Sequence, residues 1–162
     1  MRRTILAILM ALALVVIPAG SAFAANQDTV TITAKPGFIS ISNAPNSYTA
    51  DPLLEGTDNA TPTSYFTITN SSKNVNIDIK IKSNGWTSWT WGAPASMQGK
   101  LAASAGTGAF DIDIAAKDTD YPLCSNVTPA TSPTWELKLL APTAFTNGDT
   151  QTTTVTLTAS KH

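Results

Sequence analysis

The sequence has little of three kinds of residue that many functional classes need. Charged residues make up only 13% of the 162 residues, and there is one cysteine and one histidine. One cysteine excludes a disulfide framework within the chain and a zinc site built on several thiolates. The ten basic and eleven acidic residues nearly cancel, which argues against nucleic-acid binding. The apolar share of 43% is normal for a globular protein, so the low charge does not indicate disorder.

Long apolar runs are missing too, apart from one near the N-terminus. The start Met1-Arg2-Arg3 is followed by an apolar run from Ile5 to Ile17 and by the small-x-small sequence Ala22-Phe23-Ala24. This order is typical of a secretory signal peptide and predicts cleavage after Ala24. The alternative, an uncleaved membrane anchor, is disfavoured because the run is shorter than the about 20 residues of a spanning helix.

Removal of residues 1–24 by the general secretory route would leave one domain over residues 25–162. Eight basic and eleven acidic residues remain in it, and there is no second apolar span. We therefore expect a secreted or cell-surface protein without integral membrane association. Export without an intrachain disulfide suits a bacterial or archaeal exterior better than a small eukaryotic secreted domain.

Threonine is abundant, with 25 residues, and much of it lies in alternating stretches. The clearest is residues 75–82, Val-Asn-Ile-Asp-Ile-Lys-Ile-Lys, with β-branched apolar residues on one face and polar residues on the other. This pattern predicts a half-buried antiparallel strand. The same alternation recurs over residues 29–33, 38–42, 65–69, 110–114, 135–139 and 154–158. Turn-forming sequences separate these stretches, at residues 35–37, 70–72, 83–85 and 147–149.

Seven short strands with frequent turns predict an all-β fold, an antiparallel sandwich of the Ig-like or jelly-roll type. A closed barrel is the main alternative. A transmembrane barrel is disfavoured because Asp78, Lys80 and Lys82 would face lipid. One segment, Ser96–Ala105, could instead form a short helix.

The residues needed for catalysis are few. His162 is the last residue, where chain ends are usually mobile, so a held imidazole for a Ser-His-Asp or Cys-His site is not expected. Cys124 has no basic neighbour to lower its pKa, so we expect a buried or half-buried thiol, or one that pairs between subunits. Asp111 and Asp113 would share a face about 7 Å apart, near the spacing of inverting glycosidases. Because the neighbouring isoleucines take the core side, we expect these carboxylates to be solvated and the protein to be no enzyme.

Two further carboxylates alternate in the loop Asp118-Thr119-Asp120. With backbone carbonyls, Asp118 and Asp120 could bind calcium. The glycine and the terminal glutamate of a calcium-binding loop are missing, so solvated charge is the stronger interpretation. No other cofactor is predicted.

Three tryptophans, Trp86, Trp89 and Trp91, fall within six residues. If the segment is a strand, Trp89 and Trp91 share a face about 7 Å apart and could stack on successive sugar rings, while Trp86 lies on the other face. The interpretation that we favour buries one tryptophan in the core and places one or two at an edge or subunit interface.

The sequence Thr134-Trp135-Glu136-Leu137 carries a Trp-x-Leu motif through Trp135 and Leu137, and a Thr-rich closing stretch follows it. Over residues 134–160 the chain resembles the WxL-type wall-associated domains of Gram-positive surface proteins, which implies attachment to peptidoglycan. That family carries two such motifs, and this chain has one. In architecture the chain is similar to secreted fibre and matrix subunits of the camelysin and TasA type.

These features predict a secreted, non-enzymatic structural protein: a subunit of a surface layer, filament or matrix, or a cell-wall-associated module. Its expected partners are copies of itself or cell-wall polysaccharide. One route to self-association is the segment 28–34, in which Val30, Ile32 and Ala34 share a face and could add as a strand to a neighbour. The alternative function is a carbohydrate-binding module with a tryptophan platform.

Overall fold

The computed structural model of the protein describes residues 32–146 and 148–162. Lys35–His162 form one compact unit, to which residues 32–34 do not belong. The predicted signal peptide (residues 1–24), Val30 of the predicted added strand and Asn147 of a predicted turn lie outside the described residues. A single domain over residues 25–162 stays a prediction, because residues 25–31 lie outside them too.

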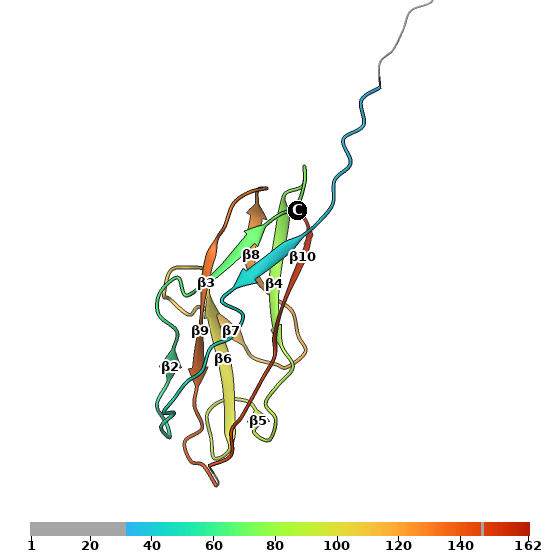
Figure 1. The fold of residues 1–162 in the computed structure, drawn as a ribbon. Helices are drawn as coiled ribbons and strands as arrows, with labels where there is room; N and C mark the ends of the chain where they lie inside the picture. Colours follow the sequence, from blue (N-terminus) through green and yellow to red (C-terminus); the bar gives the residue numbers. More distant parts are fainter. Residues whose placement is uncertain (1–31, 147) are drawn as a thin grey trace, which may run out of the picture. The chain divides into compact units, whose positions relative to one another are not determined.

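Ten strands in the described residues make up two sheets (Figure 1). One sheet has the order β1-β3-β9-β6-β5, with β2 paired to β9 and β7 paired to β6; the other has the order β10-β4-β8. The strands are β1 (Ile41–Ala44), β2 (Asn59–Ala60), β3 (Phe66–Asn70), β4 (Ile77–Ser83), β5 (Thr90–Trp91), β6 (Gln98–Ser104), β7 (Ile112–Ile114), β8 (Tyr121–Val127), β9 (Thr134–Leu140) and β10 (Val155–Lys161).

Both sheets contribute to one hydrophobic core, which confirms the all-β prediction; the Ig-like or jelly-roll type stays a prediction. The strand β4 shows why the sequence folds this way. Ile77, Ile79 and Ile81 are fully buried, while Lys80 between them is exposed. The period-two pattern therefore gives β4 one core face and one polar face. Phe66 and Ile68 of β3, Trp135 and Leu139 of β9, and Leu101 of β6 close the core from the other sheet.

The prediction of a short helix over Ser96–Ala105 is wrong, because most of this segment is β6. The strand pairs with β9 along one edge and with β7 along the other. Ala102 and Ala103 lie buried at its centre. Alanine favours helices, but two strand neighbours and a buried position outweigh that weak propensity.

Neither of the first two predicted strands forms over the whole of its described residues. Of the stretch 29–33, the described residues Ile32 and Thr33 lie in no strand, and Lys35-Pro36-Gly37 forms no turn. The stretch 38–42 becomes a strand only from Ile41 onward, after an isolated bridge between Phe38 and Lys73. Phe38 and Ile39 are both exposed, so neither face of this segment has a core to pack on.

Glu136 lies between Trp135 and Leu137, on the face of β9 that alternation assigns to solvent, yet it is fully buried. Its carboxylate oxygens accept hydrogen bonds from the backbone N–H groups of Ser64, at 2.6 Å, and of Gly108, at 3.3 Å. Two loops thus cover the outer face of β9. A buried carboxylate is tolerated there because both oxygens have donors.

Substitution Ile79→Ala should lower the free energy of unfolding by about 2–5 kcal/mol, because it leaves a cavity at a fully buried site. Lys80→Ala, on the opposite face of the same strand, should change it by no more than about 0.5 kcal/mol. Urea denaturation of both variants measures the difference. Equal effects would contradict the assignment of the two faces of β4.

Candidate functional site

The tryptophan cluster follows the turn at the end of β4. Gly85 has a φ of +90°, a conformation that favours glycine, and redirects the chain into Trp86. Only Thr90 and Trp91 are in a strand, β5, which pairs in parallel with β6. The prediction that Trp89 and Trp91 share a strand face is therefore wrong, because residues 87–89 form bends and Trp89 lies in no strand.

The three indoles separate into a core residue and a stacked pair. Trp89 is buried and stacks on Phe145, with ring centroids 5.4 Å apart and planes 6° apart. Trp86 and Trp91 are half-buried and stack on each other, with centroids 6.0 Å apart and planes 25° apart. One tryptophan is thus in the core, as the favoured interpretation expected, and the half-buried pair is a different one from that of the strand hypothesis.

Hydrogen bonds fix both rings of this pair. The indole N–H of Trp86 donates to the carbonyl oxygen of Gly99, at 2.9 Å, and that of Trp91 donates to the carbonyl oxygen of Ile114, at 3.0 Å. Because each polar edge is bonded to the backbone, the ring faces are held in place without any ligand.

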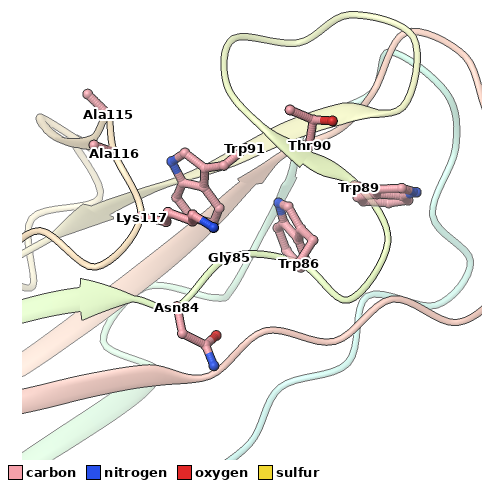
Figure 2. Close-up of a pocket in the computed structure, with 9 residues that line it drawn as sticks. All are labelled: Asn84, Gly85, Trp86, Trp89, Thr90, Trp91, Ala115, Ala116 and Lys117. Carbon is pink, nitrogen blue, oxygen red and sulfur yellow. The ribbon is translucent and has the colours of Figure 1, made fainter.

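A pocket of about 390 Å³ lies beside the pair (Figure 2). Asn84, Thr90 and Lys117 add hydrogen-bonding groups to its lining, and Ala115 and Ala116 form part of its wall. Aromatic faces next to a few polar groups suit a ring that carries hydroxyl groups. The lining therefore offers binding groups for such a ring.

A larger groove, of about 980 Å³, runs between the two sheets. Its lining comes from strands of both sheets and from the segments that follow β1 and precede β10, and it includes Ile41, Phe66, Leu101, Trp135, Leu137 and Leu157. The groove is bordered by β1 and β10, each of which stands at the end of its sheet order in the described residues.

The Trp-x-Leu motif lines this groove and is largely a core feature. Trp135 is 2% exposed, and its ring stacks on Phe66 with centroids 4.4 Å apart. Its indole N–H donates to the side-chain oxygen of Asn43 on β1, at 2.8 Å. Leu137, two residues on, is half-buried. The motif thus connects β9 to β3 and β1.

The apolar face of β10 is less well covered than that of its partner strand. Val155, Leu157 and Ala159 are half-buried, although they pair in register with Ser83, Ile81 and Ile79, which are fully buried. Alternation predicted this apolar face, but no local pattern indicated that part of it would lack a covering strand. The contributions of Phe145 and of residues 148–154 to the groove were also missed, because they lie in loops without a pattern.

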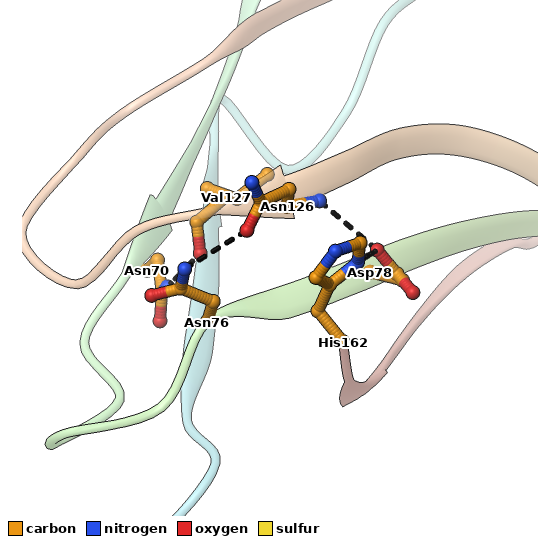
Figure 3. Close-up of polar contacts among 6 residues, drawn as sticks. All are labelled: Asn70, Asn76, Asp78, Asn126, Val127 and His162. Carbon is orange, nitrogen blue, oxygen red and sulfur yellow. Dashed lines mark hydrogen bonds and ion pairs between the residues drawn. The ribbon is translucent and has the colours of Figure 1, made fainter.

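His162 is held rather than loose at the end of β10 (Figure 3). Its Nδ1 lies 2.7 Å from Oδ1 of Asp78, and its backbone N–H donates to the carbonyl oxygen of Asn76, at 3.0 Å. The backbone N–H of Asn126 donates to the same Asp78 oxygen, at 3.0 Å. That bond, followed by the bond to His162, holds the pKa of Asp78 below its usual value. The cluster joins the ends of β10, β4 and β8.

The other carboxylates that the sequence singled out are on the surface. Asp111 and Asp113 are exposed, and Asp113 forms an ion pair with Lys100 at 2.8 Å. Asp118 and Asp120 are exposed as well, and calcium binding there stays the weaker, untested alternative to solvated charge. Within residues 32–146 and 148–162, no group of three or more His, Cys, Asp or Glu side chains could hold a metal ion.

Cys124 lies on β8 as a half-buried free thiol, as predicted. Burial raises the pKa of this thiol, so it stays protonated at neutral pH and is a weak nucleophile.

No protein-family model matches the chain, and no curated protein or solved structure matches it. The resemblances to WxL-type domains and to camelysin or TasA subunits therefore stay expectations. In the part of the chain that the structure describes, no helix has the length and apolar character needed to cross a bilayer.

Substitution Asp78→Asn should destabilise the protein at pH 6, and the difference from wild type should shrink as the pH falls below about 4. A folded-state pKa lowered by hydrogen bonds contributes stability above the unfolded pKa and loses it as Asp78 is protonated. Thermal melts of both proteins between pH 6 and pH 2.5 measure this. A difference that is constant over the whole range would contradict the role of these bonds.

Proposed function

We propose that the mature chain is a non-enzymatic structural protein of the cell exterior, a subunit of a surface layer, filament or matrix. The observation that carries the proposal is the groove between β1 and β10, which reaches apolar core residues and is bordered by one end strand of each sheet order in the described residues. Strand edges beside an uncovered apolar surface favour association with another chain.

The composition supports the same proposal. The expected export signal sends the chain to a compartment where a stable, sparsely charged β-sandwich can serve as a building block. Threonine and serine alternate with apolar residues on β10, at Thr156, Thr158 and Ser160, so its outer face is polar without carrying repelling charges. Copies of such a strand can approach one another at little electrostatic cost.

Mature protein, residues 25–162, should form concentration-dependent polymers or ordered sheets. Light scattering over a concentration series, with negative-stain electron microscopy of the same samples, measures the size distribution and the order of the particles. A strict monomer at every concentration would contradict the structural role.

The pocket beside Trp86 and Trp91 favours a second candidate function, binding of a carbohydrate such as cell-wall polysaccharide. The two indoles are fixed by backbone hydrogen bonds, so stacking of a sugar ring would cost little ordering of side chains. This function is compatible with a wall-associated module and does not need assembly.

If this second function holds, added cell-wall glycans should shift the tryptophan fluorescence of the wild type. Trp91→Ala should weaken glycan binding at least tenfold, whereas Ser88→Ala, an exposed position in the same segment, should not change it. Trp91→Phe keeps an aromatic face, and it serves as the control that weaker binding of Trp91→Ala is not caused by unfolding. No fluorescence change with any glycan would count against the pocket as a sugar site.

A further inference from the structure

We propose that the groove between β1 and β10 binds residues 28–34 of a second copy of the chain as an added β-strand. This inference rests on the proposed structural function and names the contact through which copies would join. The strand would lie along the side of β10 that faces away from β4, which we call the outer edge of β10.

The core on this side of the sandwich has room for one more strand. In the described residues β10 has β4 as its neighbour and nothing on its outer edge, and β1 likewise pairs with β3 alone. Between these two strands the groove reaches the core residues Trp135 and Leu101. A strand placed there would cover Val155 and Leu157, which are half-buried, and would pair with the N–H and C=O groups of the outer edge.

The segment 28–34 has the pattern that this position needs. Val30, Ile32 and Ala34 alternate with Thr29, Thr31 and Thr33, which is the same Thr-apolar alternation as in β10. A strand of seven residues spans about 23 Å, and β10 also has seven residues. With the apolar residues turned into the groove, the threonines would continue the polar outer face of the sheet.

The described end of this segment forms no strand of its own. Ile32 is 87% exposed, and Ile32 and Ala34 lie in no strand. An alternating segment that forms no strand within its own chain can be completed as a strand on the sheet edge of a partner.

The path of the chain favours insertion of residues 28–34 into a neighbouring copy over insertion into the groove of the same chain. The carbonyl oxygen of Pro36 accepts a hydrogen bond from the side chain of Asn74, at 3.2 Å, and that of Phe38 accepts one from the backbone of Lys73, at 3.1 Å. Residues 36–44 therefore run in one direction along the segment 67–74, and no turn interrupts residues 35–37.

The groove meets β10 at the opposite end. It is lined by Val155 and Leu157, which pair with Ser83 and Ile81 at the end of β4, whereas Asn74 precedes the start of β4. The compact unit thus begins at one end of the sandwich, and the groove extends from β1 near that end towards the other end, where it meets β10. Insertion of each segment into the next copy joins unlike surfaces head to tail, a contact that extends into a filament or closes into a ring according to the rotation between copies.

The direct test adds a peptide of residues 25–34 to a chain of residues 35–162, which forms a compact unit with its own core. Saturating peptide should raise the melting temperature by about 5 °C without forming polymers. A peptide with Val30→Asp and Ile32→Asp should give no shift, while one with Thr31→Asp, on the other face, should keep most of it. Absence of a shift, or equal shifts with all three peptides, would overturn the proposal.

The second test compares assembly of residues 25–162 with assembly of residues 35–162 and of the Ile32→Asp variant of the full mature chain. The wild type should assemble and both altered chains should stay monomeric, with melting temperatures that show them folded. Equal assembly of the wild type and the shortened chain would overturn strand insertion and leave the structural function standing. A wild-type chain that never assembles would contradict the structural function itself. If residues 25–34 raise the melting temperature at every dilution, the segment binds the groove of its own chain. That result would overturn the proposal that it binds a second copy.

Discussion

The structure depends on one constraint: each of the two sheets has an apolar face that must be removed from water by the other. On the side of β4 this is achieved completely, because Ile77, Ile79 and Ile81 are fully buried against β3, β9 and β6. On the side of β10 and β1 the two sheets leave a groove of about 980 Å³, and the apolar residues of β10 are only half-buried. The proposed function in assembly rests on this incomplete side.

The polar features of the sandwich stabilise the strands that border the groove. Asp78, Asn126 and His162 join the end of β10 to β4 and β8, and Asn43 on β1 accepts a hydrogen bond from Trp135 on β9. Both border strands are therefore anchored to the core while their outer sides remain available for pairing in the described part of the chain. Because the border strands are already held in place, a partner strand that binds them would order few additional groups and lose less conformational entropy.

Alternation in the sequence predicted the fold well wherever one face of a strand meets the core. For β4 it placed every buried isoleucine, and for β9 it placed Trp135 and Leu139 inside. It failed where long-range contacts determine the structure. Two neighbouring strands hold the Ala-rich β6 extended. Two loops bury Glu136 on the face of β9 that the alternation predicts to be solvent-exposed. The three closely spaced tryptophans located the site in the sequence. Its geometry was not predicted, because it depends on the backbone conformation at Gly85 and on carbonyl groups of other strands. The groove was not predictable, since a missing neighbour leaves no mark in the local pattern.

The most direct test of the account is hydrogen–deuterium exchange of β10 in monomeric and assembled mature protein. Amides of residues 155–161 that are not bonded to β4 should exchange quickly in the monomer and be protected in the assembly, because an added strand would bond them. The amides of β4 should be protected in both states and serve as the internal reference. An outer edge of β10 that exchanges equally fast in both states would contradict the claim that this edge receives the strand.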